Sequence, residues 1–364
     1  MVGGEIILDT STTISASKFT CSLISSMIGV GVLYLPNVTI RSCQQDAWIT
    51  CVIAVAYPIY LTLICCYISK KNNENILQLS IKCFGPIFGN IANLIFISFF
   101  IFLMTSQLAD FSDLFRVYST NFLTKIQVFL ASAMVIAYVC YKGIITITKL
   151  NEVLFYLTLV LIFVPLGTLV EGSIMNIKPI LGTGVLNIIK GSKEALYFYI
   201  GAENIFLFYP FLEDKKKLLP CGIIGIIFVM LVCTGAVFLS IYYLGIDVAI
   251  KFLWPMVALS DAINIPIITS TRYIFISLWG LLALKCMVMS YFSACFSLNQ
   301  VFKKVSTNNF SLILYPVAII LTSFYGNLTT SRYYFNKITV IYVLYNLIFT
   351  SAIFIIIRFK KTHN

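Results

Sequence analysis

The sequence predicts an all-α polytopic membrane protein with about ten transmembrane helices, and composition and hydropathy patterning support this prediction. Hydrophobic residues make up 60% of the 364 residues and charged residues only 11%, whereas soluble domains carry about 25% charged residues. The mean hydropathy is +0.96, and the chain divides into apolar runs long enough to span a bilayer as helices. Short polar links separate these runs, so the whole chain, 1–364, is expected to form one transmembrane domain.

An even number of spans places both termini on the same side of the membrane. The loops on the side of the termini carry more lysine and arginine than the loops on the other side, as in the run Lys215-Lys216-Lys217. Because cytoplasmic loops are richer in these residues, both termini are expected in the cytoplasm. Glu5 and Asp9 precede the first apolar run in place of a basic segment, so that run is expected to remain as a span rather than act as a cleaved signal peptide. The ten expected spans are 19–38, 47–68, 87–111, 126–142, 151–170, 194–212, 221–245, 267–298, 309–326 and 338–357, with the eighth too long for one simple span.

The first span is interrupted at its centre by Gly29-Val30-Gly31, with Pro36 shortly after. Two glycines and a proline weaken a helix at mid-depth. Lipid tolerates unwound backbone only where it is buried in protein or lines a cavity. The sequence therefore predicts a broken first helix.

The sixth span carries a second weak point, because Gly201 precedes the intramembrane pair Glu203-Asn204 and Pro210 closes the segment. Breaks five spans apart are typical of a 5+5 inverted repeat, here approximately 15–170 and 190–357, in which a solute binds between the two broken helices. Tyr197 precedes Gly201 by one helical turn and is expected on the same face. The candidate ligand-binding residues are Gly29, Val30, Gly31, Tyr197, Gly201, Glu203 and Asn204.

Glu203 has three possible roles, since charges inside membrane spans tend to be functional. It could bind a solute, cap a broken helix end as a structural carboxylate, or relay protons. Two aspartates, Asp110 and Asp113, lie with Gln107 at the outer end of the third span, where solvation at the interface explains them. Lys285 lies well inside the eighth span, where it either snorkels, if the span is shifted, or faces the bundle interior and pairs with a carboxylate.

Several functions and cofactors are not expected. The net charge of +11 is divided among short loops, so it indicates membrane topology and contact with anionic lipid rather than nucleic-acid binding. The eleven cysteines are scattered without a Cys-x-x-Cys pair, and the single histidine is His363. Neither a metal site nor another cofactor is therefore expected.

Between the second and third spans, the pattern of residues 72–86 predicts a short interfacial helix that ends at Gly85-Pro86.

The segment Met-Ile-Gly-Val-Gly-Val-Leu-Tyr-Leu-Pro at 27–36 resembles the first-helix signature of the amino acid–polyamine–organocation permeases. Three further motifs are Asp46-Ala47-Trp48, Gly85-Pro86-Ile87-Phe88-Gly89 and Gly201-Ala202-Glu203-Asn204. Together they resemble the spore germination permease family, the integral-membrane B subunits of germinant receptors. The resemblance covers nearly the whole chain, from about 15 to 357.

This resemblance implies a single permease-like domain in the spore inner membrane. It implies a small germinant, usually an amino acid, bound at Gly29 and Gly31 of the first span and at Gly201 and Glu203 of the sixth. It also implies an A subunit and a lipoprotein C subunit as partners.

Three classes of function remain open at the level of sequence. A ligand-sensing receptor subunit is favoured, and an active amino-acid or proton-coupled permease is the alternative. A membrane-embedded enzyme is not expected, because the spans contain no histidine and no Ser/Lys or Asp/Asp constellation at useful spacing.

Overall fold

A computed structural model describes residues 13–262 and 270–359, and almost all of this part of the chain is helical. Helical segments occur at all ten predicted spans. In chain order they are α1 (Ala16–Met27) with α2 (Gly31–Cys43), α3 (Ala47–Ala54) with α4 (Ala56–Lys71), α6 (Pro86–Tyr118), α7 (Lys125–Tyr141), α8 (Ile144–Leu166), α9 (Val185–Leu196) with α10 (Ile205–Phe208), α11 (Leu218–Leu244), α14 (Thr271–Val301), α15 (Thr307–Ser323) and α16 (Leu328–Phe359). By length and hydropathy alone, six helical stretches of the described residues can cross a membrane, while α7 and α15 are shorter apolar helices.

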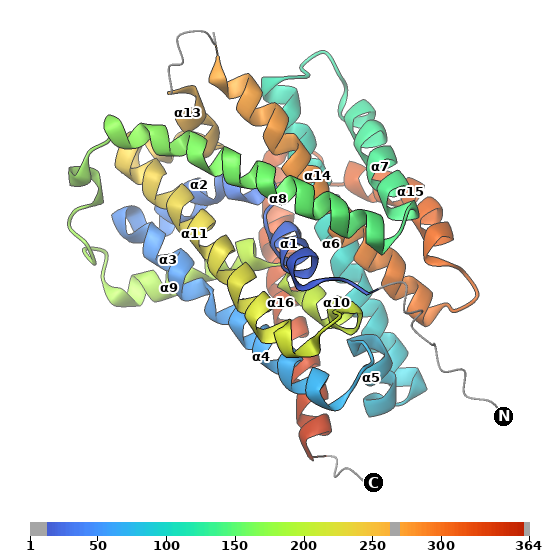
Figure 1. The fold of residues 1–364 in the computed structure, drawn as a ribbon. Helices are drawn as coiled ribbons and strands as arrows, with labels where there is room; N and C mark the ends of the chain where they lie inside the picture. Colours follow the sequence, from blue (N-terminus) through green and yellow to red (C-terminus); the bar gives the residue numbers. More distant parts are fainter. Residues whose placement is uncertain (1–12, 263–269, 360–364) are drawn as a thin grey trace, which may run out of the picture.

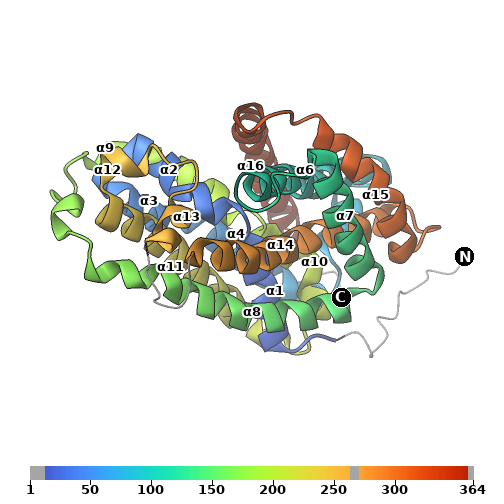
Figure 2. The ribbon, with the colours of Figure 1, turned by 90° about the horizontal axis from the view of Figure 1, so that it is seen from above.

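The segments form one helical bundle built around α1 and α14 (Figures 1 and 2). Helix α14 packs against α1, α6, α8 and α15, and α1 packs in turn against α8 and α11. Large side chains such as Tyr199, Phe206 and Trp279 are fully buried. The eighth predicted span, 267–298, corresponds to α14, and its first residues lie outside the described part of the chain.

The first span is broken where the glycines predict. Helix α1 ends at Met27, Ile28 is extended with φ −89° and ψ 105°, and α2 begins at Gly31. The indole Nε1 of Trp279 donates to the carbonyl oxygen of Gly29 at 3.3 Å. This bond satisfies one carbonyl group freed by the break, as a membrane interior requires.

The sixth span is interrupted over a longer stretch. After α9 come a 3₁₀ turn at Tyr197–Tyr199, an extended Ile200 with ψ 138° and Gly201 with φ +110°. Glycine is the residue that adopts positive φ at little steric cost. A second 3₁₀ turn, Ala202–Asn204, leads into the short helix α10.

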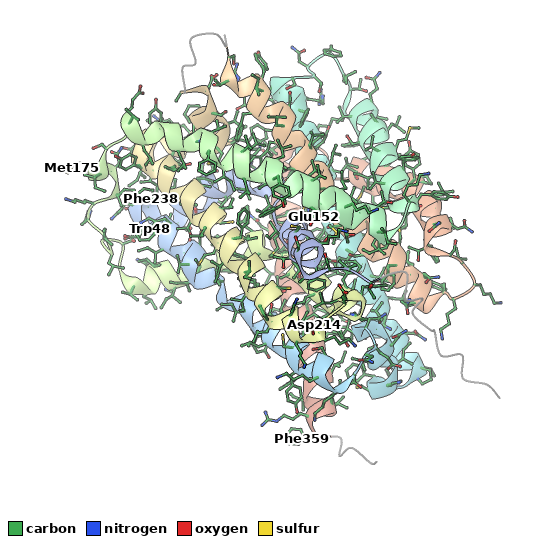
Figure 3. All side chains as sticks on the ribbon, in the orientation of Figure 1. Trp48, Glu152, Met175, Asp214, Phe238 and Phe359 are labelled. Atoms are coloured by element: carbon green, nitrogen blue, oxygen red, sulfur yellow. The ribbon has the colours of Figure 1, made fainter. Side chains whose placement is uncertain are left out.

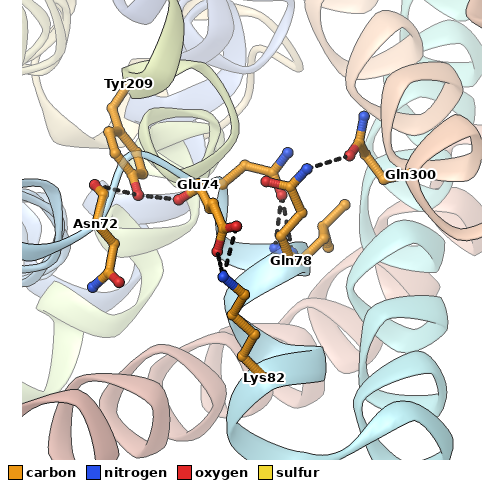
Figure 4. Close-up of polar contacts among 8 residues, drawn as sticks. Asn72, Glu74, Gln78, Lys82, Tyr209 and Gln300 are labelled. Atoms are coloured by element: carbon orange, nitrogen blue, oxygen red, sulfur yellow. Dashed lines mark hydrogen bonds and ion pairs between the residues drawn. The ribbon is translucent and has the colours of Figure 1, made fainter. Parts of the chain in front are cut away.

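A short helix, α5 (Ile76–Phe84), lies between the second and third spans and confirms the helix predicted within 72–86. The side chain of Asn75 caps it by accepting from the backbone N–H of Leu77 at 3.1 Å. Figure 4 shows how this region is attached to the bundle. The Tyr209 hydroxyl donates to the carbonyl oxygen of Glu74, and Gln78 Nε2 donates to Gln300 Oε1 at 3.1 Å. Helix α5 therefore connects the ends of the sixth and eighth spans.

The motif Asp46-Ala47-Trp48 has a structural role at the opposite end of the bundle. Asp46 is fully buried and accepts from the backbone N–H groups of Leu181 at 2.7 Å and Thr183 at 2.9 Å. Its carboxylate thereby fixes the loop ahead of α9. Trp48 packs edge to face on Phe238 of α11 with ring centroids 6.2 Å apart. Figure 3 labels both residues.

Two further helices, α12 (Ile246–Ala249) and α13 (Pro255–Asp261), lie between α11 and α14. Asp261 at the end of α13 pairs with Arg272 at the start of α14, with Nη1 and Oδ2 3.1 Å apart. Both side chains are partly exposed. Arg272 also lies over the Tyr118 ring at 5.6 Å, and Tyr118 packs edge to face on Trp254 with ring centroids 5.8 Å apart.

Candidate functional site

The two helix breaks contact each other directly. The hydroxyl of Ser26, in the last turn of α1, donates to the carbonyl oxygen of Gly201 at 3.0 Å. A Cβ atom added to Gly201 would lie only 2.1 Å from the carbonyl oxygen of Ser26. The glycine is therefore required both by its positive φ and by the close approach of the two backbones.

A cavity of about 40 Å³ adjoins the break in the first span. Its walls come from both halves of the first span, α6, the turn after α9, α14 and α16. A cavity must offer about 10–15 Å³ to hold one water molecule, so this site has room for only a few water molecules. Of the predicted ligand-binding residues, Gly29, Val30, Gly31 and Tyr197 line the cavity, while Gly201, Glu203 and Asn204 are outside its lining.

The N-terminus of α2 supplies the positive end of the site. Within the described chain no side chain caps this helix, so the backbone N–H groups of its first turn have no intrahelical acceptor. The macrodipole places roughly half a positive charge at the same end. Residues Val30 and Gly31, which form this end, line the cavity, so an anionic group there would be stabilised.

Asp110 and Gln107 on α6 supply a negative and polar wall of the same cavity. Asp110 is only 7% exposed, and its Oδ1 accepts from the Ser331 hydroxyl at 3.3 Å. The Oε1 atom of Gln107 is buried and has no hydrogen-bond partner among the described residues. A Cβ atom on Gly29 would lie 2.9 Å from this oxygen, so the amide rests against the helix break.

The expectation that interfacial solvation explains the two aspartates is wrong. Asp113 is also buried, and it pairs with Lys125, with Oδ1 and Nζ 2.5 Å apart. The signal that could have identified Asp110 is its spacing from Gln107. Residues three apart share one face of a helix, and this face of α6 points towards the bundle interior.

Glu203 is engaged by the protein itself. Its Oε2 atom accepts from the backbone N–H of Gly201 at 2.8 Å. Its Oε1 atom accepts from the Tyr57 hydroxyl and from Asn346 Nδ2 at 3.2 Å. This geometry matches the structural alternative, a carboxylate that caps the broken sixth helix, and its predicted role in ligand binding remains a prediction. Asn204 is held similarly, with its Nδ2 donating to Gly201 at 3.0 Å.

Aromatic side chains cover the cavity on the side of Trp254. Tyr34 and Phe198 both line it, with ring centroids 5.3 Å apart in an edge-to-face arrangement. The guanidinium of Arg332 lies over the Tyr34 ring at 4.5 Å and over the Trp254 ring at 5.8 Å. This cluster joins the first, sixth and tenth spans above the cavity.

In the part of the chain that the structure describes, long apolar helices and two broken helices that meet beside a cavity define a membrane protein with the architecture of secondary transporters. The sequence profile of the family described as spore germination protein matches residues 13–331. The chain therefore belongs to the spore germination permease family, and it is a multi-pass membrane protein.

Curated relatives agree with this assignment. The chain is 22% identical over 297 residues to spore germination protein YndE of Bacillus subtilis (strain 168), covering 80% of this chain and 82% of the relative. It is 24% identical over 322 residues to spore germination protein B2 of the same organism, covering 84% and 87%. Spore germination protein GerQB of Bacillus cereus is 21% identical over 259 residues, covering 71% and 72%.

A solved structure shows the same fold. Mhp1, a nucleobase-cation-symport-1 family transporter in a closed conformation with bromovinylhydantoin bound, superposes with a TM-score of 0.61. The alignment covers 88% of this chain and 74% of Mhp1 at 12% sequence identity. At this identity the likeness concerns the fold alone.

Proposed function

We propose that this chain is the B-type membrane subunit of a spore germinant receptor and that it binds a small zwitterionic nutrient, an amino acid, at the break in the first span. The observation that carries the proposal is that a positive helix end and a carboxyl group line the same cavity. The uncapped N-terminus of α2 forms one wall, and the buried carboxyl group of Asp110 forms another. The proposal assigns the chain no catalytic step.

The carboxylate of the ligand is assigned to the start of α2. Free backbone N–H groups and the positive helix end are suited to an anion. Gly29 and Gly31 have no side chains, so a ligand can approach this backbone closely.

The ammonium group of the ligand is assigned to Asp110, with Gln107 as an additional acceptor. A buried carboxylate and an unpartnered amide oxygen together favour a hydrogen-bonding cation. Glu203 is less suited to this task because Tyr57, Asn346 and the Gly201 backbone already donate to it. Its proposed contribution is to hold the sixth-span break against the first.

Binding of the ligand requires the site to open. Ligand pockets for small molecules commonly measure about 300–1,000 Å³, far more than the about 40 Å³ found here. Movement of Tyr34 and Phe198, the aromatic cover, would enlarge the cavity. A ligand that binds one arrangement of the broken helices better than the other shifts their populations, and a partner subunit can respond to that shift.

The remaining assignments concern the complex. We place the chain in the spore inner membrane with both termini in the cytoplasm, together with an A subunit and a lipoprotein C subunit. The spore germination relatives support the complex, and the distribution of lysine and arginine supports the orientation.

The proposal is tested with spores whose only germinant receptor contains this chain. Each active amino acid is compared with the α-hydroxy acid and the amine that share its side chain. The amino acid should trigger germination, and both analogues should fail because each lacks one of the two charges. An equal response to the hydroxy acid would refute the assignment of Asp110.

An active permease is the second candidate, and the likeness to Mhp1 in fold favours it. Uptake of labelled amino acid by vesicles that contain only this chain separates the two functions. Accumulation above that of empty vesicles would establish transport, whereas binding without accumulation is expected of a sensor.

A further inference from the structure

A groove of about 580 Å³ lies between α6, α15 and α16, away from the break in the first span. Helix α6 packs against both α15 and α16, and Figure 2 shows the three helices on the same side of the bundle. Leu321, Phe324 and Tyr334, which line the groove, are 37%, 74% and 44% exposed. The groove is therefore open to the surroundings of the bundle, which for membrane-spanning helices are lipid.

The polar groups in the groove walls are engaged by the protein itself. The hydroxyls of Ser98 and Tyr342 form a hydrogen bond of 2.9 Å, and those of Thr105 and Tyr325 form one of 3.2 Å. Thr105 also bonds to the carbonyl oxygen of Ile101 at 2.9 Å. An unpaired polar group facing hydrocarbon is costly, and these four hydroxyls avoid that cost in pairs. The walls therefore suit an apolar occupant better than a polar solute.

The length of the groove distinguishes a lipid chain from a partner helix. Its lining extends from Ser98 to Thr105 along α6 and from Tyr334 to Tyr342 along α16, about 12 Å at 1.5 Å per residue. A transmembrane helix of another subunit would cross the whole hydrocarbon core of about 30 Å, whereas the acyl chain of a lipid occupies one leaflet, about 15 Å. The groove matches the acyl chain.

Lys337 supplies a positive charge beside the groove. It follows Tyr334 by one turn of α16, so the two side chains are neighbours, and it directly precedes the predicted span 338–357. The lysine is exposed, and none of the ion pairs within 13–262 and 270–359 includes it. Its Nζ lies 5.9 Å from the centre of the Tyr333 ring. A long side chain at the end of a span places its ammonium group among the lipid head groups, where it attracts an anionic one.

The groove shares a wall with the cavity at the first-span break. Phe102 lines the groove and stacks on Phe335 with ring centroids 5.9 Å apart, and Phe335 lines the cavity. The two rings come from α6 and α16, which also carry Asp110 and its partner Ser331. An occupant of the groove would therefore support the packing of α16 on α6.

We propose that the groove between α6, α15 and α16 binds one anionic phospholipid, with an acyl chain in the groove and the phosphate at Lys337. The acyl chain fills space that the side chains leave open and holds α16 against α6. The lipid is bound as a ligand at a defined site and is distinct from the lipid that surrounds the bundle. This inference does not depend on the identity of the germinant.

The experiment measures lipid binding to the purified full chain in detergent by native mass spectrometry. Phosphatidylglycerol and phosphatidylcholine with the same acyl chains are the two probes. The wild type should bind one phosphatidylglycerol about 5-fold more tightly than phosphatidylcholine, and Lys337→Gln should abolish this preference. Lys251→Gln is the matched control, because Lys251 is also exposed but lies in the loop after α12, and it should behave as the wild type. A wild-type preference in Lys337→Gln would overturn the assignment of the phosphate.

Two further variants fill the groove, Ile338→Trp from α16 and Leu321→Trp from α15. Each should weaken the binding of phosphatidylglycerol by on the order of 10-fold, because the larger side chain takes the place of the acyl chain. Val160→Trp is the matched control, since Val160 is 61% exposed on α8 and lies outside the groove lining. Equal binding by the wild type and both groove variants would overturn the site, and it is the result expected if the groove instead receives a helix of a partner subunit.

Discussion

Gly201→Ala tests whether the contact between the two breaks stabilises the fold. Alanine at φ +110° is strained by roughly 1–2 kcal/mol. Its Cβ would also lie 2.1 Å from the carbonyl oxygen and 2.8 Å from the carbonyl carbon of Ser26. These are backbone atoms, which cannot rotate away, so overpacking adds about 1–3 kcal/mol. The two effects together lower the free energy of unfolding by about 2–5 kcal/mol.

A thiol-reactive dye can report this change, because ten of the eleven cysteines are buried in the fold and react once it opens. With about 2–4 °C per kcal/mol, the unfolding midpoint of Gly201→Ala should fall by on the order of 4–20 °C. Gly235→Ala is the matched control, since a Cβ atom at this position in α11 meets nothing within 4 Å. Its midpoint should be unchanged or slightly raised, because alanine favours helix. Equal midpoints for Gly201→Ala and the wild type would refute the reasoning.

Two further substitutions examine Glu203 and the cavity. Tyr57→Phe removes a buried donor to Glu203 and should lower the free energy of unfolding by about 1–3 kcal/mol. Tyr60→Phe is the control, because the Tyr60 hydroxyl is exposed, and it should have little effect in the same dye assay. Equal effects of the two substitutions would contradict the capping role of Glu203. Gly31→Leu should abolish the germination response while the chain still inserts into the membrane, because even a Cβ atom at this position would lie 3.0 Å from Phe198. The amount of protein is checked by immunoblot. An unchanged half-maximal germinant concentration would argue against binding at the break.

Much of the fold follows from hydropathy and from glycine. The positions of the helical segments and of both breaks could largely be predicted, because runs of about 20 apolar residues have few alternatives in a membrane. The sixth span is the exception, since its first helix, α9, begins at Val185 rather than at residue 194. Gly29, Gly31 and Gly201 were identifiable because glycine within such a run weakens the helix. The helix α5 was predictable from its apolar pattern and from the Gly85-Pro86 pair that follows it.

The partners of the buried polar groups could not be predicted in this way. Glu203 is satisfied by Tyr57 from α4 and Asn346 from α16, which lie 146 and 143 residues away in the sequence. Hydropathy records how polar a residue is but not which helix faces it. For the same reason the sequence alone predicts that Asp110 lies at the interface, although α16 covers it through Ser331.

Lys285 illustrates the same limit from the opposite direction. A lone lysine in an apolar span suggests either a nearby carboxylate or a shifted span. The structure instead buries it, with its Nζ donating to the Thr158 hydroxyl on α8 at 2.9 Å. Which residue of α8 faces Lys285 depends on how α8 and α14 pack against each other, and hydropathy does not record this packing.

The central claim, that a zwitterionic ligand is held between α2 and Asp110, is tested most directly by the germination dose response of Asp110→Asn. Loss of a charged hydrogen bond costs about 1.5–3 kcal/mol, so the half-maximal amino-acid concentration should rise roughly 10- to 150-fold. Asp113→Asn is the matched control, because Asp113 lies one turn further along α6, outside the cavity lining, and pairs with Lys125. A large shift for Asp110→Asn with a wild-type response for Asp113→Asn is the predicted result, and a wild-type dose response for Asp110→Asn would contradict the account.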